Sequence, residues 1–335
     1  MITVLPSAKL ELDHRAYHLL AVATSSHVLA LSQKGQCSLI ASDFSLLKSF
    51  HLSEAPTSIA LAPAGDLMAI TIPARMLILD VLTQNAVTSF HGSYASAAFS
   101  PDGRVLWSVR RLTTDLVSVE VRDCQTWCLV CQAELHDLFG ESSFDLYFHP
   151  RGEYVGLWAA AGQDGQAIFF ARANGTSVEI TRLANVDNTT PPIFHRDGNS
   201  FLILVDDTNE LRHYDFPDCT LLGVVPCLED ERSGYYTQFV GDHHALMQWG
   251  EGLLYLVDLH TYSIVDEVAI LGHEPRPIPE LYPTLKDDVG IGSDLCFFQP
   301  LHPGTFISVH QRLPKSSDDG EKYLLLAWDA PWIDP

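Results

Sequence analysis

Short apolar runs alternate with polar turns along the whole chain. The clearest copy of this pattern runs from Ala95 to Asp123: ASAAFS, the turn Pro101-Asp102-Gly103, VLWSV, a polar loop and LVSVEVRD. Proline fixes φ, aspartate accepts hydrogen bonds inside a turn, and glycine adopts positive φ, so this tripeptide favours a tight turn between antiparallel strands. The pattern therefore predicts a strand-turn-strand unit followed by a third strand that ends in aspartate.

The same unit recurs along the chain. Most copies follow one another roughly 37 to 49 residues apart, close to the period of about 40–45 residues of a four-stranded propeller blade. The copies number seven. Equivalent turns lie at Pro63-Ala64-Gly65, Pro150-Arg151-Gly152, Arg196-Asp197-Gly198, Gly241-Asp242-His243 and His302-Pro303-Gly304.

This repetition predicts an all-β fold: a seven-bladed β-propeller of four-stranded antiparallel blades, forming a single domain over residues 1–335. The inner strands are apolar on both faces, so neighbouring blades must cover one another and no blade is expected to fold alone. The predicted repeats span approximately residues 14–55, 56–93, 94–140, 141–187, 188–232, 233–271 and 293–335, with an N-terminal closing strand over 2–12 and a Pro-rich insert over 272–292.

The last repeat ends soon after its third strand, whereas residues 2–12 (ITVLPSAKLEL) are strand-like and belong to no repeat. We predict that they pair beside Tyr323–Asp329 as the missing fourth strand. Such pairing joins the two ends of the chain and removes an open sheet edge.

The repeats resemble those of the WD40 family, in which a Ser-Pro-Asp-Gly turn follows the first strand and Trp-Asp closes the third. Ser100–Gly103 matches the turn, and Trp328-Asp329 is the one literal copy of the dipeptide. The resemblance covers nearly the whole chain, although no copy shows the family's Gly-His pair with a clear partner. It implies a propeller that binds other proteins at a rim formed by its loops.

The chain carries 42 acidic and 20 basic residues, a formal charge of −22. This charge repels phosphate backbones and anionic lipid heads, so nucleic acid and membranes are not expected as partners. The acidity serves solubility and would also attract a basic partner surface. Seven scattered cysteines, with no signal-like start and no long apolar run, favour free thiols in the cytoplasm.

One cysteine cluster has spacing that resembles a metal site. Cys124, Cys128 and Cys131 form C-x3-C-x2-C, and His136 could be a fourth zinc ligand. Strand alternation on a hairpin would point these side chains to different faces, so we interpret the cysteines as small core residues. We expect neither a metal nor a cofactor.

No hydrolase elbow, phosphate-binding loop or dinucleotide-binding motif lies in a supporting context. Asp145, Gln238 and Asp294 could project into a central channel, which leaves a lactonase-like hydrolase or a small-ligand sensor as alternatives. The main hypothesis is a non-catalytic protein–protein interaction scaffold without catalytic residues, acting as a subunit of a larger assembly.

The mapping of the repeats onto the family's rim gives candidate contacts for a protein partner. Arginine is scarce in this acidic chain and is enriched among interface hot spots, whereas the alternative reading of these positions is ordinary hairpin tips. The Pro-rich insert should be extended and polyproline-like. An exposed leucine or tyrosine in it could anchor a partner, or the insert could be a strap over one face. The candidates are Arg75, Arg110, Arg111, Asp164, Asp206 and Glu251 on the rim, with Leu281 and Tyr282 in the insert.

Overall fold

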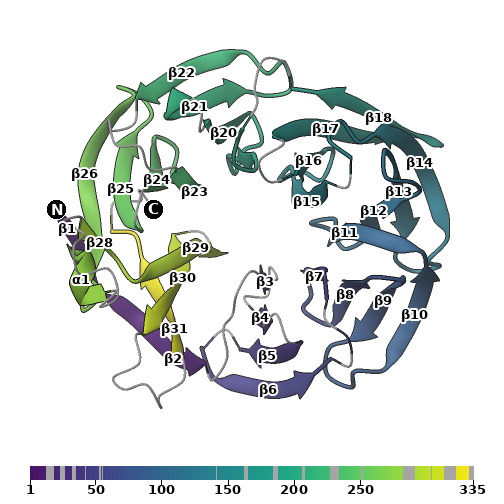
Figure 1. The fold of residues 1–335 in the computed structure, drawn as a ribbon, viewed down its shortest axis with the longest axis horizontal. Helices are drawn as coiled ribbons and strands as arrows, with labels where there is room; N and C mark the ends of the chain where they lie inside the picture. Colours follow the sequence, from purple (N-terminus) through teal and green to yellow (C-terminus); the bar gives the residue numbers. More distant parts are fainter. Residues whose placement is uncertain are drawn as a thin grey trace. The chain divides into compact units, whose positions relative to one another are not determined.

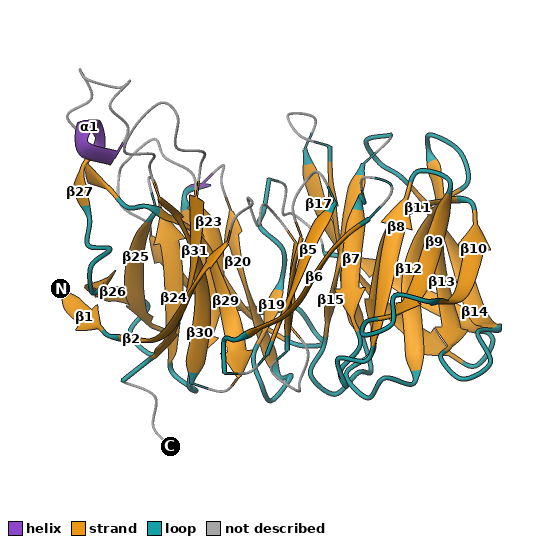
Figure 2. Ribbon diagram, turned by 90° about the horizontal axis from the view of Figure 1, so that it is seen from below, coloured by secondary structure: helices purple, strands orange, loops and turns teal. Residues whose placement is uncertain are grey.

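The chain is nearly all β-structure, with one four-residue helix among the described residues (Figures 1 and 2). The computed structural model describes residues 1–12, 19–22, 27–31, 35–41, 43–52, 54, 56–140, 142–161, 165–183, 188–205, 208–226, 234–249, 252–281, 291–302, 304–312 and 322–331. None of the helical residues in these ranges forms a segment long and apolar enough to span a membrane.

The chain divides into two compact units. Residues 17–42 and 46–198 form one, here called the central unit, and residues 1–16, 43–45 and 199–335 form the other, here called the terminal unit. A single domain over the whole chain stays a prediction.

The central unit consists of antiparallel sheets whose strands pair in chain order. The third and fourth of these sheets are joined by one parallel bridge between Gln132 and Ser177. The sheets are β3 (Leu19–Val22), β4 (Val28–Leu31), β5 (Gln36–Ile40) and β6 (Leu46–His51); β7 (Ser58–Leu61), β8 (Leu67–Ile72), β9 (Arg75–Asp80) and β10 (Ala86–His91); β11 (Ser93–Phe99), β12 (Val105–Arg111), β13 (Leu116–Asp123) and β14 (Leu129–His136); and β15 (Ser143–Phe148), β16 (Val155–Ala160), β17 (Gln166–Asn174) and β18 (Ser177–Arg182), followed by β19 (Ile193–Phe194).

The terminal unit repeats the same arrangement. Its sheets contain β20 (Ser200–Val205), β21 (Glu210–Asp215) and β22 (Leu221–Pro226); β23 (Gly234–Val240), β24 (His244–Trp249), β25 (Leu253–Asp258) and β26 (Ser263–Ile270); and β29 (Leu295–His302), β30 (Thr305–Arg312) and β31 (Lys322–Asp329). Two N-terminal strands, β1 (Ile2–Val4) and β2 (Pro6–Leu12), add to these sheets.

Within each unit the core lies between neighbouring sheets, as the two-sided apolar strands predicted. Leu29 and Cys37 of the first sheet pack with Met68 and Ile70 of the second. In the terminal unit, Leu202 and Leu204 join Met247 and Val257 in the same way. Burial of each such Leu, Ile or Met side chain contributes about 1.5–3 kcal/mol, so the stability of a sheet depends on its neighbour.

The first twelve residues pair with two different sheets. The predicted pairing with the last strand holds for β2, whose Leu10 and Leu12 lie opposite Leu325 and Tyr323 of β31. It is wrong for residues 2–4, because β1 pairs in parallel with β26, with Ile2 opposite Val268. The chain steps between the sheets at Leu5, which is exposed.

The insert is only partly extended. Arg276–Pro277 (β27) pair with Ile291–Gly292 (β28), but Ile278–Leu281 form one helical turn, α1, instead of the predicted polyproline-like strand. Ile278 and Leu281 lie three residues apart, on one side of that turn, and both are buried. Burial of this apolar pair explains why the segment coils in spite of its prolines.

The predicted turns are present in the central unit, and one of them also contacts the preceding repeat. The N–H of Gly103 donates to the carbonyl of Ser100 at 2.8 Å, and the N–H of Gly198 donates to that of His195 at 2.9 Å. Both glycines have positive φ, 70° and 73°. Gly198 also lies against the preceding repeat, where its carbonyl oxygen is 2.8 Å from His149 Nε2.

This contact predicts a specific cost for a side chain at Gly198. In Gly198→Ala, the new Cβ would lie 2.2 Å from His149 Nε2, so the imidazole must move in addition to the strain of positive φ. Gly175 also has positive φ, 61°, but nothing lies within 4 Å of a Cβ there, so Gly175→Ala is a matched control. Positive φ alone costs about 1–2 kcal/mol, so we expect Gly198→Ala to lower the free energy of unfolding in urea by at least about 1 kcal/mol more than Gly175→Ala. Equal losses in the two variants would contradict this account.

Candidate functional site

Arg75 is the most accessible of the three predicted rim arginines. Its Nη2 is 2.8 Å from Glu54 Oε1, and both side chains are more than 40% exposed. An exposed ion pair of this kind contributes little to stability. Arg75 is therefore available for contact with a partner.

Arg110 lies beside a buried carboxylate. Its Nη1 is 3.6 Å from Oε1 of Glu120, whose side chain is 2% exposed. Arg122 Nη2 is 2.6 Å from the other oxygen of Glu120, and the Arg122 guanidinium lies over the Phe90 ring at 4.3 Å. Removal of a partner from a buried carboxylate is strongly destabilising, so Arg110 and Arg122 have a structural role.

Arg111 binds two residues of the loop between β14 and β15, Asp137 and Ser142. Its guanidinium forms an ion pair with Asp137 at 3.4 Å and donates to the carbonyl oxygen of Ser142. Burial opposes ionisation of Asp137, but hydrogen bonds from Ser142 outweigh burial and lower the pKa of Asp137 below its ordinary value. Arg111 thus neutralises a buried carboxylate inside its own unit.

The other predicted contact residues do not come together in the described part of the chain. Leu281 of the insert was predicted to be exposed, and this is wrong, because its side chain is only 1% exposed. Asp164, Asp206, Glu251 and Tyr282 lie outside the described residues.

The three clustered cysteines differ in their surroundings. Cys131 is buried, Cys124 is half-buried and Cys128 is exposed. Burial, followed by the nearby charges of Asp123 and Asp102, raises the pKa of Cys124 to about 12. This thiol therefore stays protonated at neutral pH in the metal-free chain. The interpretation of the cysteines as core residues fits Cys131 and is wrong for the exposed Cys128.

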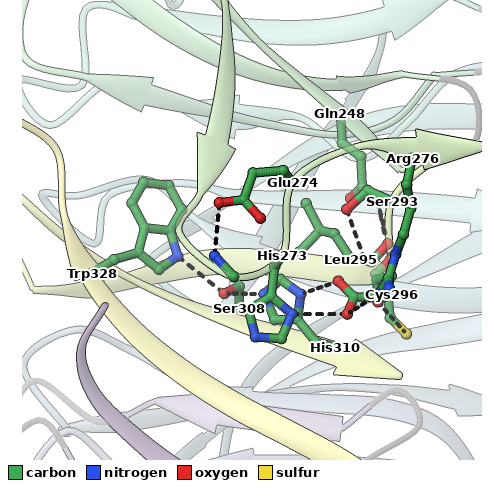
Figure 3. Close-up of polar contacts among 12 residues, drawn as sticks. Gln248, His273, Glu274, Arg276, Ser293, Leu295, Cys296, Ser308, His310 and Trp328 are labelled. Atoms are coloured by element: carbon green, nitrogen blue, oxygen red, sulfur yellow. Dashed lines mark hydrogen bonds and ion pairs between the residues drawn. The ribbon is translucent and has the colours of Figure 1, made fainter. Parts of the chain in front are cut away.

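A polar cluster that the sequence did not predict lies in the terminal unit (Figure 3). We call it the Asp294 cluster, and it consists of His273, Asp294, Ser308, His310 and Trp328. His273 lies in the turn after β26, where its N–H donates to the carbonyl of Ile270, and Asp294 directly precedes β29. Ser308 and His310 are two residues apart on β30, so their side chains share one face of the sheet.

These side chains form one continuous chain of hydrogen bonds. Trp328 Nε1 donates to Ser308 Oγ at 3.0 Å, and Ser308 Oγ lies 2.9 Å from His310 Nε2. His310 Nδ1 is 2.8 Å from Asp294 Oδ1, and His273 Nδ1 is 2.8 Å from Asp294 Oδ2. The indole only donates, so Ser308 passes its own hydrogen to His310, and each histidine donates its Nδ1–H to the carboxylate.

The electrostatics of the cluster keep Asp294 charged. Burial opposes its ionisation, yet the hydrogen bonds from His273 and His310 outweigh burial and hold the pKa of Asp294 well below its ordinary value. Burial also lowers the pKa of His310, against the pull of Asp294, so this imidazole stays neutral at pH 7. Arg276 lies farther out, half-exposed, with Nη2 3.7 Å from Asp294 Oδ2.

Of the three residues considered for a channel, Asp294 is thus fully engaged by two imidazoles. Gln238 lies half-buried on β23 of the same unit. Asp145 lies on β15 of the central unit, with an accessible side chain, and desolvation by the surrounding protein raises its pKa to about 6.

The signal that sequence reasoning missed is the pair Gly272-His273. It is the Gly-His dipeptide of the resembled family, and its partner Asp294 follows 21 residues later, beyond the insert. With Ser308, His310 and Trp328 it gives this sheet a buried hydrogen-bond network like the Ser-His-Asp-Trp network of strong repeats.

A second feature is a set of exposed apolar side chains near the start of the fourth strand of several repeats. In the central unit these residues include Leu46 and Leu47 on β6 and Leu129 and Val130 on β14, all more than 40% exposed. The remaining members are Val87 on β10, Leu221 and Leu222 on β22, and Val265 on β26. Their recurrence at the same strand position makes these side chains candidate contact points for a partner.

No family model and no curated protein sequence matches this chain. Among solved structures, the chain is similar to the β-propeller domain of Cps50 (Swd1) from Myceliophteria thermophila, with a TM-score of 0.64 and 9% identity over 97% of this chain and 99% of that one. It is also similar to hydrazine synthase from Kuenenia stuttgartiensis, with a TM-score of 0.52 and 14% identity over 74% and 82% of the two chains. These similarities support a β-propeller fold.

The Asp294 cluster predicts acid-sensitive stability. We expect Asp294→Asn to lower the free energy of unfolding at pH 7 by about 3 kcal/mol, because two buried imidazole donors lose their charged acceptor. The folded-state pKa of Asp294 is depressed, so its contribution is present above the unfolded-state value of about 3.8 and is lost as the pH falls further.

Urea unfolding of the native chain and Asp294→Asn at pH 7, 5 and 3, with a chelator present, measures this. The difference between the two should be smaller at pH 3 than at pH 5. Asp218→Asn, at an exposed carboxylate in the turn after β21, is the control and should have a smaller effect. A difference that does not change with pH would contradict the assignment.

Proposed function

We propose that this chain is a WD40-like, seven-bladed β-propeller that acts as a non-catalytic scaffold for protein–protein interaction, as one subunit of a larger assembly. The β-propeller fold and the recurrence of four-strand units in chain order support this proposal. The pairing of β2 with β31 supports the inference that the N-terminal strand closes the propeller.

The single observation that carries the scaffold function is the set of exposed apolar side chains on the fourth strands. Sheets of both units present exposed apolar side chains at corresponding strand positions, and each pair is a candidate contact point for a partner: Leu46 and Leu47, Leu129 and Val130, and Leu221 and Leu222. The net charge of −22 favours a partner with a basic surface, and we place this interaction in the cytoplasm.

The alternative of a propeller hydrolase has less support. It requires free carboxylates and amides that converge on a substrate. Asp294, one of its three proposed groups, already accepts hydrogen bonds from His273 and His310 with both oxygens.

The apolar contact points can be tested on β14. We expect the double change Leu129→Ser and Val130→Ser to lower the recovery of partner proteins from host-cell extract at least tenfold, since burial of each side chain contributes about 1.5–3 kcal/mol. Both side chains are exposed, so the free energy of unfolding should change by less than about 1 kcal/mol.

The control for this test is the double change Leu5→Ser and Leu82→Ser, at exposed apolar positions outside both the fourth strands and the rim loops. Quantitative mass spectrometry of the recovered proteins is the readout. Undiminished recovery of every partner with the β14 variant would refute the fourth-strand assignment.

The rim can be tested at Arg75. We expect Arg75→Ala to weaken the binding of a co-purified partner roughly tenfold or more, as for other arginine hot spots, while stability stays unchanged. Arg104→Ala is the control, because Arg104 is 84% exposed and lies in a turn. Arg110 and Arg111 do not suit this test, because their removal takes one charged partner away from buried Glu120 and Asp137. Equal partner binding by the two variants would exclude Arg75 from the interface.

A further inference from the structure

Three side chains of the Asp294 cluster that could bind a metal ion lie close together in the terminal unit. One ligand atom from each of His273, Asp294 and His310 lies within 4.8 Å of the other two, and among the described residues this is the one such group of three or more. The residues come from a turn, the start of β29 and the middle of β30, so folding and not local sequence brings them together.

We propose that His273, Asp294 and His310 bind a transition-metal dication, with Zn²⁺ as the ion that suits two imidazoles and a carboxylate. The ion would fasten the start of the insert, through His273, onto the sheet of β29 to β31. This inference is independent of the scaffold function.

The distances are close to those of a coordinated ion. Zinc binds imidazole nitrogen at about 2.0–2.1 Å and carboxylate oxygen at about 2.0–2.2 Å, so two ligand atoms on one zinc ion lie roughly 3–3.5 Å apart. The two Nδ1–carboxylate distances are both 2.8 Å. Movements of a few tenths of an ångström at His273 and Asp294 would open the space that the ion requires.

The protons balance when the ion binds. Each histidine donates its Nδ1–H to Asp294 in the metal-free cluster, and each must present an unprotonated Nδ1 to zinc. A neutral imidazole does so by a change of tautomer, which moves its hydrogen to Nε2 without the release of a proton. Ser308 Oγ, which has two lone pairs, can then accept from both His310 Nε2 and Trp328 Nε1.

Ser308 and Trp328 thus supply the outer contacts that hold a metal-binding histidine in orientation. His310 is 1% exposed, and its position on the face of β30 leaves it little freedom. A cavity of about 10 Å³ borders His273, His310 and Ser293, which is space on the order of one water molecule as a fourth ligand.

Arg276 distinguishes a metal site from a purely structural cluster. Its guanidinium lies 3.7 Å from Asp294 and is 44% exposed, so it competes with a cation for the carboxylate but can turn toward solvent. Replacement of Arg276 by glutamine removes this repulsion. If the cluster binds zinc, Arg276→Gln should leave the affinity for zinc equal or higher. If the cluster serves only as an ion pair, Arg276 stabilises it, and Arg276→Gln should lower the free energy of unfolding.

The test is a calorimetric titration of the purified full chain, stripped with a chelator and dialysed, with ZnCl2, and a parallel titration with CoCl2 followed by visible absorption. We expect one ion per chain and ligand-field bands from cobalt. His273→Asn, at a partly exposed turn position, should fold normally by circular dichroism and lower zinc affinity by more than tenfold. Ser308→Ala should lower it by about 10- to 100-fold.

The control is His260→Asn, because His260 is an exposed histidine in the turn between β25 and β26 and outside the three-residue group, and its removal should leave the affinity unchanged. Three results would overturn the proposal: no zinc binding by the native chain, binding that His273→Asn leaves intact, or a loss of affinity with Arg276→Gln as large as that with His273→Asn. Binding of several ions, insensitive to His273→Asn, would assign the metal to surface histidines and equally reject the site.

Discussion

Each sheet of this chain carries apolar side chains on both faces, and water must be excluded from both. Leu29, Met68 and Ile70 meet between two sheets of the central unit, and Leu202, Met247 and Val257 meet between two sheets of the terminal unit. No sheet has a core of its own, so the fold depends on the packing of neighbours. The same demand explains why the inner strands are rich in apolar residues.

Where charges do enter the interior, they are matched locally. Glu120 lies between Arg110 and Arg122, Asp137 accepts from Arg111, and Asp294 accepts from two imidazoles. A buried carboxylate must be paired with a cation or hydrogen-bonded, because burial of an unpaired charge is costly. Arg110 and Arg111, two of the three arginines predicted to contact a partner, instead form ion pairs with these buried carboxylates.

What the sequence revealed was the local part of the structure. The turn Pro101-Asp102-Gly103 and the pairing of residues 6–12 with the last strand follow from turn chemistry and strand patterning, and both are present. The dipeptide Gly272-His273 pointed to His273 but not to its partner Asp294, because the insert separates the two residues and no short pattern links them. Leu281 was misplaced for a related reason: its prolines indicated an exposed strand, whereas burial beside Ile278 decided the conformation.

The contact of Gly198 with His149 ties together positions 49 residues apart in successive repeats. A repeat that arose by duplication is usually free to drift, since each copy has its own turn. Here a change at one position alters the space available at the other. Among related chains we therefore expect positions 149 and 198 to covary, so that substitutions in one repeat accompany substitutions in the next.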